Sequence, residues 1–209
     1  MRSFGHWKPR YVLARGREVI DHKLNPRNPW LTPQSVQLLN QLLRASDVAL
    51  EFGSGRSTFW IAERVKQLTS VEHHEGWHGR GVGVQTERGI ANLELLHIPM
   101  DVADSDGASS AYVHVLDKFA GNSLDFCLVD GMYRGHCAVG AVPKLKSGAV
   151  MVIDNAGWFL PSRSRCPNAR ALDSGPMDAV WQRFMDETSH WRRIWTTSDV
   201  TDTLILFKS

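Results

Sequence analysis

Two carboxylates and a glycine turn form the pattern in this sequence that is most suggestive of chemistry. Glu51 directly precedes Phe52-Gly53-Ser54-Gly55, and Glu72 follows at the end of the next short apolar run. Glycines at such a turn let a ligand approach the backbone closely. A carboxylate beside the turn would repel a pyrophosphate but could accept hydrogen bonds from an ammonium group, while a second acidic side chain could bind both hydroxyls of a ribose. The pattern therefore predicts a nucleoside cofactor that carries an amino-acid part.

Two further residues, Ser57 and His73, are candidate cofactor contacts. A third, Thr58, argues against a dinucleotide cofactor. Ser57 follows the glycine turn and His73 follows Glu72. The dinucleotide fingerprint G-x-G-x-x-G requires a third glycine where this chain has Thr58, and the chain has no Tyr-x-x-x-Lys pair. A nicotinamide-dependent oxidoreductase is therefore disfavoured. A strand-to-helix turn that binds no ligand is the alternative interpretation.

Oxygen-bearing side chains end two later apolar runs. Asp130 follows the run 124–129, and Asp154-Asn155 follows the run 149–153. Because the carboxyl ends of parallel strands meet at one edge of a sheet, these side chains should lie close together. Hard oxygen ligands suit Mg²⁺, Ca²⁺ or Mn²⁺ better than zinc. The alternative is that these residues only begin loops, which Asp and Asn favour.

The elements that would position these residues alternate along the chain. The apolar runs predict seven strands, at 48–52, 68–72, 93–98, 124–129, 149–153, 190–197 and 201–207. Helical spacing predicts helices at 33–45, 57–66, 77–91, 110–119, 135–145 and 177–188. This order predicts an α/β fold with a doubly wound, mostly parallel seven-stranded sheet, helices on both faces and a C-terminal antiparallel hairpin. The segment 157–176 is predicted to be a long loop that could act as a lid.

Composition limits the class of protein. The chain has 209 residues, of which 43% are hydrophobic, and a formal charge of +2. We expect an N-terminal arm at 1–31 and one domain at 32–209. Nucleic acid is a disfavoured partner because the charge is nearly balanced, although the first 17 residues are basic. No run is long enough to span a membrane and no secretory signal is evident, which predicts a cytoplasmic protein. Three cysteines without close pairing predict neither disulfides nor a zinc cluster.

Four motifs, taken in their order along the chain, resemble those of the class I S-adenosylmethionine-dependent methyltransferases. They are Glu51-Phe52-Gly53-Ser54-Gly55, Val71-Glu72, Leu128-Val129-Asp130-Gly131 and the stretch 146–154. The resemblance covers residue 32 to the C-terminus. It implies that S-adenosylmethionine is the cofactor, with its methionine part on the glycine turn and its ribose on Glu72. Ser57, His73 and Asp130 would complete the cofactor site.

A finer resemblance concerns the chemistry. Asp130 followed by Asp154-Asn155 looks like the metal site of the cation-dependent O-methyltransferases of the catechol and caffeoyl-coenzyme A type, and the sequence from Asp130 to Tyr133 is also similar to the macrocin type. This implies Mg²⁺ on Asp130, Asp154 and Asn155 and a small-molecule or sugar hydroxyl as the acceptor. Catechol-type enzymes place a lysine where this chain has Tyr133, so Asp130 and His136 are the candidate catalytic residues.

Two alternative functions stay open at this point. A nucleic-acid methyltransferase could use the basic arm, although Asp130-Gly131-Met132-Tyr133 stands where an Asn-Pro-Pro-Tyr type of motif would be expected. A non-catalytic protein could keep the fold and bind a partner. The arm could also contact a second subunit in a homo-oligomer.

Overall fold

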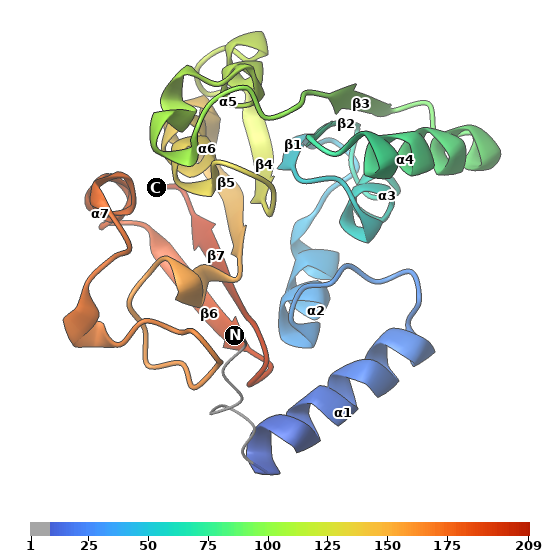
Figure 1. Ribbon diagram of the computed structural model, residues 1–209. Helices are drawn as coiled ribbons and strands as arrows, with labels where there is room; N and C mark the ends of the chain where they lie inside the picture. The colour runs from blue at the N-terminus through green and yellow to red at the C-terminus, as the bar shows by residue number, and fades with distance from the viewer. Residues whose placement is uncertain (1–8) are drawn as a thin grey trace.

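The computed structural model describes residues 9–209, which form one seven-stranded sheet with helices on both faces (Figure 1). The strand order is β3-β2-β1-β4-β5-β7-β6. The strands are β1 (Val48–Phe52), β2 (Gln67–Glu72), β3 (Leu93–His97), β4 (Leu124–Val129), β5 (Leu145–Asp154), β6 (Arg192–Thr197) and β7 (Asp202–Phe207). β1 to β5 are mutually parallel, whereas β7 is antiparallel to both β5 and β6. The predicted doubly wound fold with a C-terminal hairpin is confirmed.

The helices follow the strands in the predicted alternation. They are α1 (Pro9–Leu24), α2 (Pro33–Leu42), α3 (Arg56–Ala62), α4 (Glu75–Arg88), α5 (Ala111–His114), α6 (Arg134–Ala141) and α7 (Ala179–Glu187). Short 3₁₀ helices include η1 (Asp104–Ser109) and η4 (Ala156–Trp158). None of the helices within residues 9–209 combines the length and apolar character needed to cross a bilayer.

The central strands are buried on both faces, as their continuous apolar runs predicted. In β4, Cys127 and Val129 pack into the core under α5, α6 and α7, while Phe126 and Leu128 pack into the core under α2 and α3. Figure 1 shows these two helix groups on opposite sides of the sheet. Cys127, Cys137 and Cys166 are all buried and none forms a disulfide. The sheet edge that carries the predicted site residues is therefore held by two packed layers.

The segment expected as an arm contains a helix. α1 begins at Pro9, a residue whose fixed φ suits a first helical position, and Ala14 is its only buried residue. Arg10 pairs with Asp199, at 2.8 Å, in the turn between β6 and β7. The basic residues Arg2 and Lys8 lie outside the described part of the chain. α1 thus contacts the rest of the molecule mainly through polar groups and lies apart from the sheet in Figure 1.

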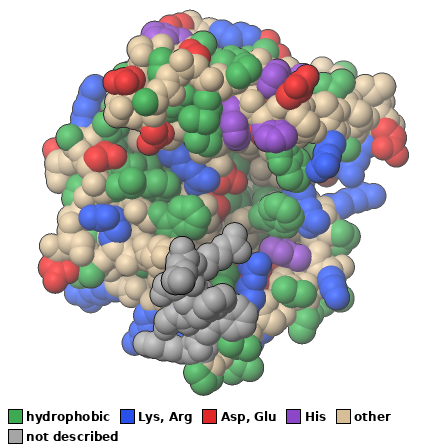
Figure 2. All heavy atoms as spheres, in the orientation of Figure 1, with side chains coloured by type: hydrophobic (Ala, Val, Ile, Leu, Met, Phe, Trp, Pro, Cys, Tyr) green, Lys and Arg blue, Asp and Glu red, His purple; other side chains and the backbone are tan. Residues whose placement is uncertain are grey.

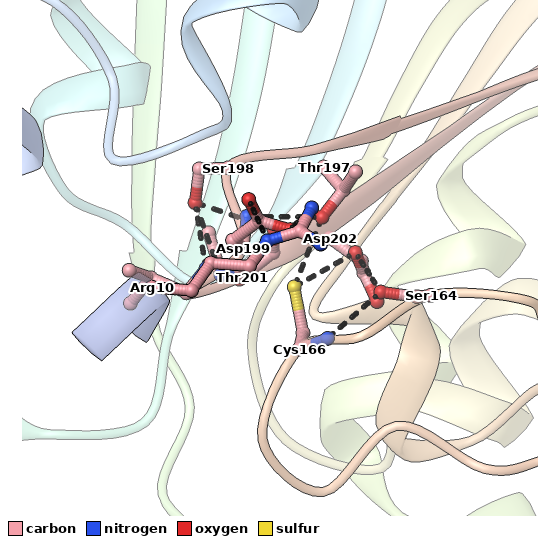
Figure 3. A network of polar contacts seen from close by, with 9 residues as sticks. Arg10, Ser164, Cys166, Thr197, Ser198, Asp199, Thr201 and Asp202 are labelled. Carbon is pink, nitrogen blue, oxygen red and sulfur yellow. Dashed lines mark hydrogen bonds and ion pairs between the residues drawn. The ribbon is translucent and has the colours of Figure 1, made fainter. Parts of the chain in front are cut away.

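The β6–β7 turn also holds the long loop 157–176 (Figure 3). Asp202 Oδ1 accepts a hydrogen bond from Ser164 Oγ at 2.8 Å and one from Cys166 Sγ at 3.1 Å. Asp202 Oδ2 is buried without a hydrogen-bond partner. Burial raises the pKa of the Cys166 thiol to about 11. One carboxylate therefore fixes the middle of the loop to the hairpin.

Candidate functional site

A cavity of about 570 Å³ lies at the carboxyl edge of the sheet, where β1, β2 and β4 end. Seven of the eight predicted cofactor contacts line it: Gly53, Ser54, Gly55, Ser57, Glu72, His73 and Asp130. Its size is within the roughly 300–1,000 Å³ typical of small-molecule sites. The structure thus brings together residues that are far apart in the sequence.

The glycine turn is built around a close approach of two strand ends. Gly53 has φ +96°, and a Cβ placed on it would lie 2.7 Å from the backbone nitrogen of Gly131. A Cβ on Gly131 would lie 2.1 Å from the hydroxyl oxygen of Tyr112. The N–H of Gly53 donates to Val71 O, and the N–H of Asp130 donates to Phe52 O, each at 2.8 Å. The turn therefore requires glycine at both positions for packing as well as for ligand access.

Glu72 is a buried carboxylate that organises the cavity wall. Its Oε2 accepts a hydrogen bond from the N–H of Ser54 at 3.0 Å, and its Oε1 accepts one from the N–H of His74 at 2.8 Å. His73 Nδ1 lies 3.0 Å from Glu72 Oε1 but is not aligned for a hydrogen bond. A carboxylate can accept about four hydrogen bonds, so acceptor capacity remains for a ligand in the cavity.

Glu51 does not line the cavity and lies beneath the glycine turn. Its Oε2 accepts hydrogen bonds from Thr58 Oγ1 at 2.5 Å and Ser70 Oγ at 2.6 Å, and Ser70 Oγ is 2.7 Å from Ser54 Oγ. Its Oε1 has no partner. Burial raises the pKa of Glu51 to about 7, although the neighbouring hydroxyls oppose that shift. Glu51 therefore supports the turn from below, through the hydroxyl of Ser70, which contacts that of Ser54.

Histidines gather beside the cavity, at the carboxyl ends of β2 and β3. The rings of His78 and His97 stack with centroids 5.3 Å apart, and His97 Nε2 is 3.3 Å from the carbonyl oxygen of His73. Figure 2 shows histidine side chains grouped on this part of the surface. Among them, His73 lines the cavity.

The three predicted metal ligands are held by other partners. The guanidinium of Arg134 lies 2.8 Å from Asp130 Oδ1 and donates to Asn155 Oδ1 at 3.2 Å. The carboxylate of Asp154 is buried and accepts a hydrogen bond from Thr203 Oγ1 at 3.0 Å. Burial raises the pKa of Asp130 and raises that of Asp154 well above its usual range, while Arg134 opposes both shifts.

The prediction of a Mg²⁺ site does not fit this arrangement. Asp154 binds Thr203, and the Asn155 amide donates to Thr201 Oγ1 at 2.6 Å. In residues 9–209, no group of three or more His, Cys, Asp or Glu side chains is placed to hold a metal ion. One side-chain oxygen of each predicted ligand is bound by another side chain of the protein, so the arrangement does not support a Mg²⁺ site and no metal-assisted step is derived.

A second cavity, of about 470 Å³, adjoins the first and contains the candidate base His136. It lies between η1 and the beginnings of α6 and α7, and it shares Gly131, Met132 and Arg134 with the first cavity. Its lining is mainly apolar and includes Phe159, Met177, Val180 and Trp181. Tyr133, at the position of the catechol-type lysine, is buried and donates to Val102 O at 2.7 Å.

The lining residues that were missed from the sequence include Trp30, Trp77 and Arg134. Trp30 and Trp77 line the first cavity and are 54% and 46% exposed, with Arg56 over the Trp30 ring and Arg80 over the Trp77 ring. Tryptophan alone gives no signal, because most tryptophans pack in cores or interfaces. Arg134 lines both cavities. The available signal was a basic residue four positions after a carboxylate at a strand end, although the residues between them form a turn and not a helix.

Comparisons with known proteins identify the fold. None of the protein-family models matches this sequence, nor does any curated protein sequence. A methyltransferase-like protein from Silicibacter pomeroyi superposes with a TM-score of 0.55 at 18% identity, covering 88% of this chain and 91% of that one. An rRNA methylase from Streptococcus thermophilus gives 0.53 at 12% identity, covering 84% and 94%. A Streptococcus mutans protein with a proposed methyltransferase assignment, solved in complex with SAH, gives 0.52 at 9%, covering 84% and 96%. The chain therefore has the methyltransferase fold.

Proposed function

We propose that this protein is an S-adenosylmethionine-dependent methyltransferase. The observation that carries the proposal is the cavity at the carboxyl edge, where the glycine turn, Glu72 and Asp130 face one space. In open α/β sheets such an edge is the usual place for a ligand. The structural neighbour solved with SAH has the same fold and supports the same cofactor.

The residues at this cavity fit the parts of the cofactor. The turn at Gly53 and Gly55 would receive the methionine part, because its backbone is free of side chains. Glu72 would accept hydrogen bonds from the ribose hydroxyls, and His73 lies beside it on the nucleoside side. When bound, the cofactor supplies an electrophilic methyl group on a positively charged sulfur. Asp130 would place negative charge near that sulfur, within the wall that separates the two cavities.

The second cavity is the proposed acceptor site, and a small molecule with an apolar body is the proposed acceptor. Its lining supplies aromatic and aliphatic surface, while Asp104, Asp178 and His136 supply polar groups. We propose transfer to a hydroxyl oxygen: the C–O bond would form as the bond between the methyl carbon and the cofactor sulfur breaks, S-adenosylhomocysteine would leave, and His136 would accept the hydroxyl proton. A positioned base of this kind contributes on the order of 10²–10⁴ in rate.

The cofactor proposal is tested by isothermal titration with S-adenosylhomocysteine. We expect binding by the wild type and a loss of at least about tenfold in affinity in Glu72→Ala, since charge-assisted hydrogen bonds contribute roughly 1.5–3 kcal/mol each. Glu87→Ala, on the exposed face of α4, is the matched control and should bind as the wild type does. A folded wild type that does not bind S-adenosylhomocysteine would contradict the proposal.

The proposed base is tested separately, by following transfer of a labelled methyl group to a panel of phenols, catechols and sugars. For an acceptor that the wild type methylates, His136→Asn should lower kcat and shift the pH dependence, with little effect on S-adenosylhomocysteine affinity. His114→Asn, at an exposed site, is the control. An unchanged pH profile in His136→Asn would remove His136 from the catalytic role.

A nucleic-acid acceptor is the second candidate. Arg56 lies 4.9 Å from the Trp30 ring and Arg80 lies 5.1 Å from the Trp77 ring, and both tryptophans border the cofactor cavity. Exposed aromatic rings beside cations are a common platform for unpaired bases. Tryptophan fluorescence quenching by a single-stranded RNA oligonucleotide, lost in Trp77→Ala, would favour this acceptor over a small molecule.

A further inference from the structure

Arg134 occupies the centre of the oxygen cluster at the ends of β4 and β5. Its Nε donates to Gly131 O at 3.0 Å, and its two terminal nitrogens donate to Asp154 O at 2.8 Å and Asp130 O at 2.9 Å. The same terminal nitrogens contact the side-chain oxygens of Asn155 and Asp130 at 3.2 Å and 2.8 Å. Four of these contacts are hydrogen bonds and the fifth is the ion pair with Asp130, so oxygens of the protein surround the guanidinium.

The oxygens around Arg134 are of the kind that a hard cation takes. Three are backbone carbonyls, one is an amide oxygen and one is a carboxylate oxygen. Carbonyl, amide and carboxylate oxygens are the ligands of Ca²⁺ and Mg²⁺ in proteins. A guanidinium meets the same oxygens with a single positive charge and a planar set of donors. The cluster is therefore already occupied by a cation that belongs to the chain.

Local backbone geometry supports this placement. Tyr133 and Asn155, next to the two strand ends, both have left-handed conformations, with φ of 50° and 51°. For a bulky residue such as tyrosine this conformation is rare and costly. α6 begins at Arg134, immediately after Tyr133, so the left-handed residue directs the first side chain of the helix into the cluster.

We propose that Arg134 is the resident cation of this site, among the residues to which the sequence resemblance assigned a divalent ion. It is a positioning residue: it fixes the carboxylate of Asp130 and joins the ends of β4 and β5 in the wall between the two cavities. The site consequently excludes Mg²⁺ and Mn²⁺. This inference deepens the proposed function, but the ion exclusion does not depend on cofactor binding.

Titration with Mn²⁺, followed by electron paramagnetic resonance of the free ion and without S-adenosylhomocysteine, tests the proposal. We expect no saturable Mn²⁺ binding by the wild type. Arg134→Ala should gain a saturable Mn²⁺ site, and the double variant with Asp130→Asn should lose it again. Arg134→Lys keeps the charge and should not gain the site. If Arg134→Ala does not fold, Arg134→Met preserves the side-chain volume and has the same expected result.

Two outcomes would overturn the proposal. The first is saturable Mn²⁺ binding by the wild type that disappears in Asp130→Asn, because the divalent ion would then coexist with Arg134. The second is a folded Arg134→Ala or Arg134→Met that gains no site, because the oxygens would then not form a cation site. A failure of S-adenosylhomocysteine to bind would contradict the proposed function and leave the Mn²⁺ result unaffected.

Discussion

At the scale of single residues, Gly53 is a position where any side chain should be strongly destabilising. Its φ of +96° disfavours any other residue, and a Cβ would lie 2.8 Å from the carbonyl group of Asp130. Gly53→Ala should therefore lower the free energy of unfolding by at least about 2 kcal/mol, from backbone strain and from overlap with β4. Chemical denaturation measures this loss.

Gly83 provides a control, because a substitution there should raise the free energy of unfolding. Gly83 lies within α4, and a Cβ there would meet no atom within 4 Å. Gly83→Ala should stabilise the protein by roughly 0.5–1 kcal/mol, because alanine loses less conformational freedom in a helix. Equal effects of the two substitutions would contradict the packing described for the glycine turn.

Glu51 should give a recognisable pH dependence of stability. Its pKa is raised from 4.5 to about 7 by burial, so the folded state holds its proton more tightly than the unfolded state. The stabilisation is complete below pH 4.5 and is lost as the pH rises through 7, a change on the order of 3 kcal/mol. Glu51→Gln should make this fall smaller, measured as unfolding free energy from pH 4 to 8, while Asp130 and Asp154, whose pKa values are also raised, continue to contribute.

Glu94 provides a comparison, because its pKa is shifted in the opposite direction to that of Glu51. The hydrogen bond from Lys118 lowers the pKa of Glu94, so its contribution is present at neutral pH and is lost as the pH falls through its folded value. Glu94→Gln should leave the fall between pH 4.5 and 7 in place. If Glu51→Gln also leaves the fall in unfolding free energy unchanged, the raised pKa of Glu51 is wrong.

Residue types predicted which groups would meet, but not how they would be oriented. The glycine turn, Glu72 and Asp130 were expected at one sheet edge because parallel strands end there together, and they line one cavity. The burial of Glu51 could not be predicted, because it depends on Ser70 in the neighbouring strand. The predicted metal site is not supported for a similar reason, since the side chain of Arg134 binds oxygens of Asp130 and Asn155.

At the scale of elements, strand and helix order was predictable and the ends were not. The helix predicted at 33–45 ends at Leu42, because Leu43 is extended, and the strand predicted at 149–153 begins at Leu145. α1 was missed because most of its apolar residues are exposed, so no buried stripe marks it. Long periodic runs identify an element, whereas its ends depend on single residues and tertiary contacts.

Asp202 is one of two hairpin residues that bind the loop 157–176, the other being Thr197, whose Oγ1 lies 3.0 Å from Cys166 Sγ. Asp202→Ala deletes the acceptor for Ser164 and Cys166, and it should cost roughly 1–3 kcal/mol while loosening the loop. The Cys166 thiol, whose pKa burial holds near 11, should then react faster with iodoacetamide at pH 8. Asp173→Ala, in the same loop and exposed, should leave the rate unchanged. An unaltered rate in Asp202→Ala would show that the loop is held elsewhere.

At the scale of the whole molecule, the two cavities meet at one wall. Gly131, Met132 and Arg134 face both spaces, and all three follow β4 directly. A donor in the first cavity and an acceptor in the second would therefore face each other across the end of one strand. The sequence located that strand end, but it could not predict the second cavity, which is closed by residues of η1 and α7.

Helix α1 should contribute little to the stability of the folded domain. Within residues 9–24 only Ala14 is buried, and the ion pair between Arg10 and Asp199 is largely exposed. An exposed pair contributes about 0–1 kcal/mol, so deleting residues 1–26 should shift the unfolding free energy by less than about 2 kcal/mol. The shortened chain should still unfold cooperatively and bind S-adenosylhomocysteine, because Trp30 and the cavity remain. A loss of cooperative unfolding, measured by calorimetry, would show instead that α1 belongs to the folded domain and would move the proposed domain boundary at residue 31.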